Sequence, residues 1–224
     1  MPTVDLALTD ANGTVRNNKV YEPTSPNGKG ILALHGGLGS PLNFQTTSQL
    51  DTLFPFHTIC YADADDTINN LWRSNQADLT DVRFLTDLID EFCKQHDIAY
   101  SDMGVIGISN GTMMAGRLLS VLDEMGIEYM VGVSGTYNAP ETFDFCGRIL
   151  MINSYHDAVV PYLGDANNTP VQETIETMKS SAIVFEQVLD RTEVSDPDFN
   201  YHAWAEIKQI YPNLDQRIQQ FVGV

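Results

Sequence analysis

One segment constrains the fold of this chain more than any other. An apolar run, Met103-Gly104-Val105-Ile106, leads into Gly107-Ile108-Ser109-Asn110-Gly111, and a helical pattern follows directly. The segment matches G-x-S-x-G in the strand–turn–helix context that this motif requires. Its glycines let the chain double back without a Cβ clash, so the turn lifts the Ser109 hydroxyl clear of a sheet and places the Asn110 N–H at a helix N-terminus. Ser109 is therefore a candidate nucleophile.

The rest of the chain alternates short apolar runs with longer helical patterns, which is typical of βαβ units. We expect buried strands at residues 30–34, 57–62, 104–108, 129–133 and 148–152. Residues 183–189 fit a last strand or the end of a helix, and we favour the strand. Residues 4–8 and 14–21 predict an antiparallel hairpin around Asp10-Ala11-Asn12-Gly13. The expected fold is α/β, with a mostly parallel central sheet, helices on both faces and an antiparallel N-terminal hairpin.

The helical patterns between these runs have recognisable ends. We expect a helix over residues 81–96 capped by Thr80 or Asp81, a second over 110–125 ending before Gly126, a third starting at Thr169-Pro170 and a closing one over 213–221. The chain of 224 residues suits one core, and we expect a single domain over residues 1–224.

The charge of the chain restricts its partners. Acidic residues outnumber basic ones by 30 to 12, for a net charge of −18. A field of that sign repels phosphate backbones and anionic lipids, so we expect neither a nucleic-acid nor a membrane partner. A neutral or weakly anionic small molecule is the expected ligand. We favour the interpretation that the acidic excess serves solubility alone, with a saline habitat as an alternative.

Location and redox state follow from weaker signals. The N-terminal residues lack the pattern of a signal peptide, and no run approaches the ~20 apolar residues that cross a bilayer. We expect a cytoplasmic protein, or a secreted one whose signal is absent from this sequence; both a monomer and a homodimer remain open. Cys60, Cys93 and Cys146 show neither zinc-ligand spacing nor a disulfide framework, so we expect reduced core thiols and no metal.

A nucleophilic serine needs a base, and the base needs a carboxylate that orients it. On a sheet of this kind the chain order is serine, acid, histidine, which excludes the three histidines that precede Ser109. Asp157 directly follows a predicted strand, with Asp165 and Asp144 as competitors that are less well placed. His202 follows the last predicted strand, and we expect it to be the base. The neighbour of Asp157, His156, is expected to shape the acid loop.

A second backbone donor for an oxyanion is expected after an early strand. The run Leu34-His35-Gly36-Gly37-Leu38-Gly39 is rich in glycine, so its N–H groups can point at a ligand. We expect the N–H of Gly37, and next that of Leu38, to complete an oxyanion hole with Asn110. His35 is expected to be a structural hydrogen-bonding residue. A phosphate-binding loop is the rival interpretation, but no Gly-Lys-Ser/Thr follows.

Together these segments resemble the polyhydroxybutyrate depolymerase and feruloyl esterase-like branch of the α/β-hydrolase superfamily. The resemblance is carried by Leu34-His35-Gly36-Gly37, Tyr61-Ala62-Asp63, residues 81–90, residues 107–114, residues 157–162 and His202-Ala203-Trp204. It implies a serine esterase for short hydroxyalkanoate or aromatic acyl esters, with no cofactor. The signal, disulfides and polymer-binding module of secreted members are not visible, which favours a small soluble ester.

The residues that bind the acyl group are less constrained. Trp72 resembles an aromatic residue near the site in that branch, and Tyr137 and Tyr162 follow predicted strands on the side where open α/β sheets bind ligands. Each could instead be a core or surface aromatic. The alternatives for the whole chain are a peptidase, thioesterase or acyltransferase with the same triad, or a binding protein with a hydrolase fold and no catalysis.

Overall fold

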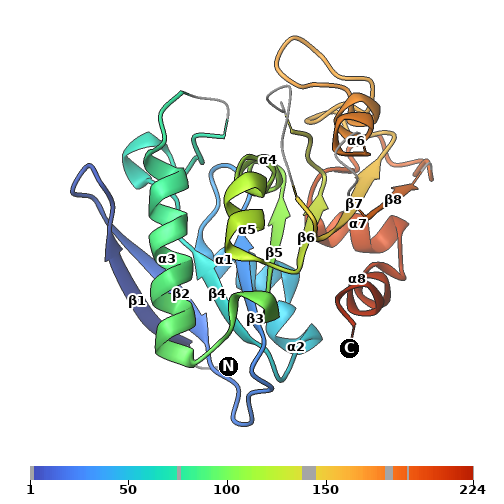
Figure 1. Cartoon of the computed structure of the whole chain (residues 1–224). Coiled ribbons are helices and arrows are strands. Elements are labelled where there is room, and N and C mark those ends of the chain that lie inside the picture. The colour runs from blue at the N-terminus through green and yellow to red at the C-terminus, as the bar shows by residue number, and fades with distance from the viewer. Residues whose placement is uncertain (1–2, 75–76, 138–144, 180–183, 191, 224) are drawn as a thin grey trace.

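The computed structural model describes residues 3–74, 77–137, 145–179, 184–190 and 192–223, with only the backbone for residues 184–190. Its centre is an eight-stranded sheet with the order β1-β2-β4-β3-β5-β6-β7-β8 (Figure 1). The strands from β4 to β8 run parallel, whereas β2 pairs antiparallel with both β1 and β4. The mostly parallel sheet and the N-terminal hairpin are therefore confirmed.

The expected strands all occur, with ends that differ by one or two residues. They are β1 (Thr3–Thr9), β2 (Val15–Tyr21), β3 (Gly30–Leu34), β4 (Thr58–Ala62), β5 (Met103–Ile108), β6 (Tyr129–Val133), β7 (Arg148–Ser154) and β8 (Val184–Asp190). The ambiguous run near residue 183 is thus a strand, although residue 183 itself lies outside the described residues. Strands β3 to β6 are buried along their whole length, as strands covered on both faces should be.

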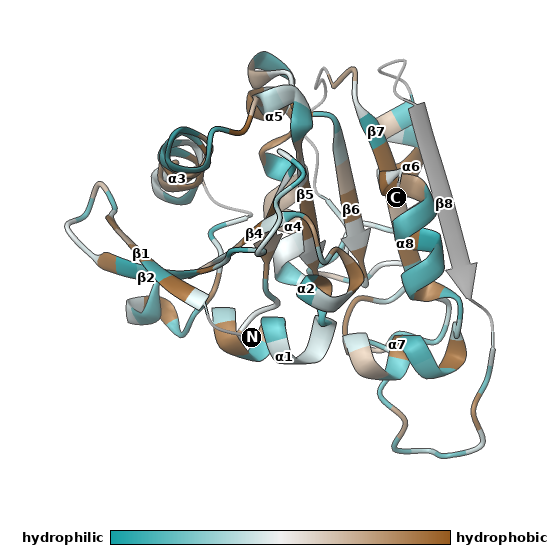
Figure 2. Cartoon of the chain, turned by 90° about the horizontal axis from the view of Figure 1, so that it is seen from below, coloured by the Kyte–Doolittle hydropathy of each residue, from teal (hydrophilic) through white to brown (hydrophobic). Residues whose placement is uncertain are grey.

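Helices cover both faces of the sheet (Figures 1 and 2). One apolar layer holds residues from α3 (Thr80–His96), α4 (Asn110–Arg117), α5 (Leu119–Met125) and α6 (Val171–Lys179). The opposite layer holds residues from α1 (Pro41–Ser48), α2 (Leu50–Leu53), α7 (Trp204–Ile210) and α8 (Leu214–Val222). Successive residues of β3 alternate between the layers: Leu32 and Leu34 belong to the first, and Ile31 and Ala33 to the second. Two short 3₁₀ turns, Asp66–Ile68 and Tyr100–Asp102, complete the described elements.

Three expected helix boundaries are wrong. The helix expected over residues 110–125 is divided at Leu118, whose N–H is shared among the carbonyls of several preceding residues instead of one. Neither Thr80 nor Asp81 caps α3, because the helix starts after Leu79. The Thr80 N–H donates to the Asp78 carboxylate, and the Asp81 carboxylate pairs with Arg16 and Arg73. Helix α6 starts at Val171, so Pro170 precedes it instead of opening it.

The cysteines differ from one another. Cys60 and Cys93 are buried, and burial raises the pKa of the Cys93 thiol to about 12. Burial also raises the pKa of Cys60, so both remain thiols at neutral pH. Cys146 is exposed, which corrects the expectation that it is a core residue.

Candidate active site

Ser109 sits on a strained turn between β5 and α4. Its φ of 53° and ψ of −122° place it in the positive-φ region of conformational space that residues with a Cβ avoid. The strain is held by backbone contacts, because a Cβ on Gly107 would lie 2.6 Å from the carbonyl of Gly111 and one on Gly111 would lie 2.2 Å from that of Leu34. The Ser109 N–H also donates to the Val133 carbonyl of β6, at 2.9 Å. Backbone atoms of β3, α4 and β6 thus hold the turn in place.

The three residues expected to form a triad lie in one hydrogen-bonded chain. The Ser109 hydroxyl is 2.7 Å from Nε2 of His202, and Nδ1 of His202 is 2.7 Å from Oδ2 of Asp157. With Nδ1–H donating to the carboxylate, Nε2 is left to accept from the serine. Residues separated by 93 positions along the chain meet here because β5, β7 and β8 all end at the same edge of the sheet. The arrangement can accept a proton from Ser109 and return it.

The Asp157 carboxylate is fixed by its own loop. Its Oδ1 accepts the N–H groups of Val159 and Val160, at 2.8 and 2.9 Å, so only Oδ2 remains for His202. The side chain is buried, and the turn that carries it follows β7 directly. The competitor Asp165 instead accepts bonds from Asn167 and Asn168 within an exposed loop, and Asp144 lies outside the described residues.

The loop that carries His202 is anchored on both sides. Before it, the Tyr201 hydroxyl accepts the N–H of Val194 at 2.6 Å, and the Tyr201 ring lies 5.4 Å from that of His156. After it, Trp204 opens α7 and is buried edge-on against Phe44 of α1, at 5.6 Å. His156 therefore contributes to the loops around the triad, in line with the sequence prediction.

The glycine-rich loop after β3 faces the nucleophile. Its turn is closed by a bond from Gly39 N–H to the Gly36 carbonyl, which leaves Gly37 and Leu38 as the two central residues. A Cβ on Gly36 would lie 3.3 Å from that of Ser109, and one on Gly37 would lie 3.8 Å from that of Asn110. The expected oxyanion residues Gly37 and Asn110 are thus neighbours, while the Leu38 side chain points into solvent and its φ is 63°.

His35 is the hydrogen-bonding residue that the sequence predicts. Its Nε2 accepts the Ala64 N–H at 3.3 Å, so Nδ1–H donates to the Gly36 carbonyl at 2.7 Å. Burial lowers the pKa of His35, although the bond to Gly36 and the charge of Asp63 act against this. The imidazole therefore stays neutral and holds the start of the glycine-rich loop after β3.

A cavity of about 430 Å³ opens beside the triad. Ser109, His202 and the glycine loop form one wall, Ile108 and the buried rings of Phe44 and Trp204 form apolar parts, and Asn43, Thr47 and Glu206 add polar side chains. Glu206 is the one acidic side chain among the lining residues. The sequence prediction missed these residues of α1 and α7, although Ser40-Pro41 carries a helix start, with the Ser40 hydroxyl accepting the Asn43 N–H.

None of the three aromatic residues expected to bind substrate lines this cavity. Trp72 is buried behind the oxyanion loop, where its indole N–H donates to the His35 carbonyl at 2.9 Å. Tyr137 is buried against Gly116 of α4, and Tyr162 is half-buried beside Tyr155. The sequence signal was position after a strand for the two tyrosines and the family resemblance for Trp72, and neither fixes the direction of a side chain.

The described part of the chain contains neither a metal-binding cluster nor a membrane-spanning helix. No group of three or more His, Cys, Asp or Glu is arranged there to hold a metal ion. Among the helices with described residues, none has the length and apolar character needed to cross a membrane.

Comparison with known proteins identifies the fold. No protein-family model matches the chain, and no curated protein matches it in sequence. Solved structures do match. A carboxylesterase from Mesorhizobium loti shares 15% identity, with 93% of this chain and 98% of the other covered and a TM-score of 0.62. The Bacillus cereus carboxylesterase shares 13% identity, with 88% of this chain and 94% of the other covered and a TM-score of 0.64. A hyperthermophilic esterase from Pyrobaculum calidifontis is similar as well: it shares 12% identity, with 99% of this chain and 85% of the other covered and a TM-score of 0.67. With the observed sheet order, these likenesses establish the α/β-hydrolase fold.

Proposed function

We propose that the protein is a serine hydrolase that cleaves carboxylic esters through an acyl-enzyme on Ser109. The observation that carries the proposal is the unbroken chain of two 2.7 Å contacts from Ser109 through His202 to Asp157. The names of the structural neighbours, carboxylesterases and an esterase, agree with this chemistry. At identities of 15% or less they support the fold, so the geometry of this chain carries the chemical argument.

The proposed reaction has two halves. Ser109 Oγ attacks the ester carbonyl while Nε2 of His202 takes its proton, and the N–H groups of Asn110 and Gly37 stabilise the negative oxygen. His202 then protonates the leaving alcohol as the C–O bond breaks. A water molecule next gives a proton to His202 and attacks the acyl group, and the protonated His202 returns that proton to Ser109 Oγ. Asp157 stabilises the imidazolium in both halves.

The cavity favours a small, uncharged acyl or alcohol group. Its apolar parts suit aliphatic or aromatic groups, and Glu206 and the net charge of −18 disfavour anionic ones. The resemblance to the polyhydroxybutyrate depolymerase and feruloyl esterase-like branch places short hydroxyalkanoate and aromatic acyl esters first among the candidates. The proposed partner is a small soluble ester.

The test is a matched panel of substrates with one acyl group and three leaving groups. Butyryl esters, thioesters and anilides should be hydrolysed in that order of kcat/KM, and Ser109→Ala should abolish ester hydrolysis. Faster cleavage of the thioester or the anilide would change the bond assigned to the enzyme. Ester hydrolysis that persists in Ser109→Ala would refute the nucleophile, and a wild-type protein inactive on the whole panel would favour a binding protein.

A further inference from the structure

The residues Leu71-Trp72-Arg73-Ser74, here called the strap, contact both loops of the proposed oxyanion hole. On one side, the Trp72 indole donates to the His35 carbonyl, and Leu71 lies against Gly37, where an added Cβ would come within 2.7 Å of its Cδ2. On the other side, the Trp72 N–H donates to Oδ1 of Asn110 at 2.7 Å. The strap therefore bridges the two residues whose N–H groups would hold the oxyanion.

The side chain of Asn110 is fully committed to the strap. Its amide nitrogen donates to the Trp72 carbonyl at 3.2 Å and to the Ser74 hydroxyl at 3.0 Å, while its oxygen accepts from Trp72. An amide is needed here because one group must both donate and accept. In the proposed reaction the backbone N–H of Asn110 binds the oxyanion, and the side chain fixes where that N–H lies.

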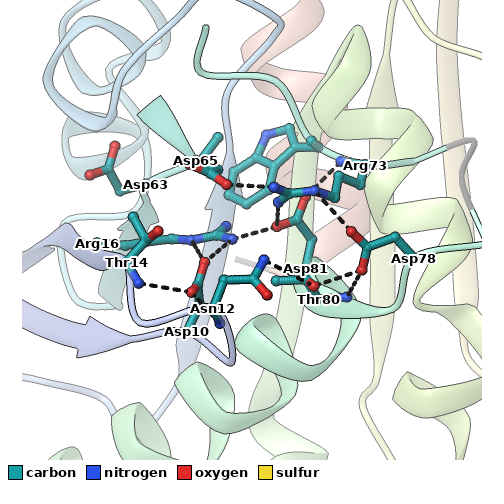
Figure 3. Close-up of polar contacts among 12 residues, drawn as sticks. Asp10, Asn12, Thr14, Arg16, Asp63, Asp65, Arg73, Asp78, Thr80 and Asp81 are labelled. Atoms are coloured by element: carbon teal, nitrogen blue, oxygen red, sulfur yellow. Dashed lines mark hydrogen bonds and ion pairs between the residues drawn. The ribbon is translucent and has the colours of Figure 1, made fainter. Parts of the chain in front are cut away.

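Arg73 anchors the strap in a buried ionic cluster (Figure 3). Its Nη2 lies 2.5 Å from Asp65, its Nη1 lies 3.1 Å from Asp81, and its Nε lies 3.2 Å from the more exposed Asp78. Its own N–H donates to Asp81 at 2.6 Å, so backbone and side chain are held by one carboxylate. Arg117 of α4, the helix that starts at the nucleophile turn, donates to the Arg73 carbonyl.

The cluster continues away from the site. Nη2 of Arg16, on β2, lies 2.6 Å from Oδ1 of Asp81 and 2.7 Å from Oδ2 of Asp10. Both carboxylates are almost inaccessible to solvent. Burial raises the pKa of Asp10, but hydrogen bonds from Arg16, Thr14 and Asn12 outweigh it and hold that pKa below its usual range. The Asp10 carboxylate is therefore charged at neutral pH. Arg16 and Asp10 form the part of the cluster that is distal to the strap, and neither of them contacts a strap residue in Figure 3.

Buried ion pairs seldom add much stability over apolar residues of the same size, so the cluster needs another reason. We propose that Arg73 is a positioning residue: through the strap, it sets the distance between the oxyanion donors Gly37 and Asn110. The inference rests on the proposed function, since it assigns the strap to the transition state of acyl transfer at Ser109. Donors placed for a developing negative charge stabilise the transition state and leave the bound ester nearly unaffected.

Three substitutions test the strap at separate points. Arg73→Lys keeps the charge but loses the forked geometry, Trp72→Phe removes the indole N–H together with part of the buried ring system, and Asn110→Ala removes the side-chain bonds while it keeps the backbone N–H. The matched control is Arg16→Lys, which weakens the same cluster on its distal side. We measure kcat and KM for p-nitrophenyl butyrate, the rate at which a fluorophosphonate modifies Ser109, and Tm.

We expect kcat and the phosphonylation rate to fall together by about 10- to 100-fold in the three strap variants, with KM within about twofold. Arg16→Lys should lower Tm without that fall in kcat. Strap variants that keep wild-type kcat overturn the proposal. So does activity that simply follows Tm across all four variants, because that is the pattern of general destabilisation.

A failure of the proposed function gives a different result. If the wild-type protein neither hydrolyses the ester nor reacts with the fluorophosphonate, the hydrolase assignment fails. The effect of the strap on the two loops is then measured by NMR, from the chemical shifts of the backbone amides of Gly37 and Asn110. Shifts in Trp72→Phe that are absent in Arg16→Lys support the positioning role, and unchanged resonances overturn it.

Discussion

Gly111 lies directly under the carbonyl of Leu34, so close that a Cβ atom on it would stand 2.2 Å from the oxygen. The same Cβ would also lie 2.6 Å from the His35 carbonyl oxygen. The start of α4 is therefore packed on the loop after β3, and this contact brings the turn that carries Ser109 against the glycine-rich loop. No side chain can move out of the way, because the atoms on the other side belong to the backbone.

Gly111→Ala should therefore destabilise the protein and displace Ser109. We expect the free energy of unfolding to fall by about 3 kcal/mol, the upper end for overpacking, because only a backbone shift relieves the clash. Urea unfolding and ester hydrolysis measure the two effects. The control is Gly126→Ala at the end of α5, where φ is 75° and the added Cβ meets open space. It should cost about 1–2 kcal/mol and keep activity; a smaller loss in Gly111→Ala than in this control would contradict the packing argument.

Asp157→Asn should remove most of the activity while the fold remains. The amide oxygen would replace Oδ1 as acceptor for Val159 and Val160, which turns the amide nitrogen towards His202. His202 must then place its proton on Nε2, where it cannot accept one from Ser109, and kcat should fall by about 10³–10⁴. Asp165→Asn, in an exposed loop, is the control and should leave kcat unchanged. Equal kcat values in the two variants would remove Asp157 from the triad.

Glu206→Gln should change selectivity for charge more than it changes turnover. At a partly exposed position its charge costs an anionic substrate about 1 kcal/mol, which corresponds to roughly fivefold in kcat/KM. The ratio of kcat/KM for a succinate half-ester to that for the butyrate ester of the same alcohol should rise by that factor, and less so in high salt. Glu124→Gln, on the exposed side of α5, should leave the ratio unchanged. A ratio that stays constant in Glu206→Gln would place the carboxylate away from the bound substrate.

His57 should make the protein sensitive to acid. It is buried, and burial together with the charge of Lys29 lowers its pKa to about 4, below the usual value near 6.5. Between these values the unfolded chain binds a proton that the folded one does not, so stability is full above pH 6.5 and falls as the pH drops towards 4. Urea unfolding between pH 7.5 and pH 4 measures the slope. His57→Phe should flatten it; an equal slope in the variant would assign the acid sensitivity to other groups.

The sequence predicted the sheet, and it singled out Ser109, Asp157 and His202, which the structure brings together, because each has a local signal. The G-x-S-x-G turn, the strand ends before Asp157 and His202, and the glycines after β3 are all short patterns. The cluster of Arg16, Arg73 and Asp81 has no such pattern, since its members lie on separate elements and meet only after folding. Trp72 was expected near the substrate, and its observed burial was not predicted for the same reason: it depends on contacts with His35 and Asn110, which are distant in sequence.

The division of the helix at Leu118 was equally hidden. Residues 110–125 carry a continuous apolar pattern, and only the shared N–H of Leu118 separates α4 from α5. The cavity also depends on tertiary packing, because α1 and α7 come from opposite ends of the chain and meet through Phe44 and Trp204. Periodicity predicts which residues are apolar, but the pairing of distant helices is set by the sheet between them.

The most direct test of the account is the site of covalent modification by a fluorophosphonate probe. Intact mass spectrometry should find one adduct per chain, and peptide mapping should place it on Ser109. Ser109→Ala should carry none, and His202→Gln should react far more slowly because the serine has lost its base. A wild-type protein that stays unmodified, or an adduct on another residue, would contradict Ser109 as the nucleophile.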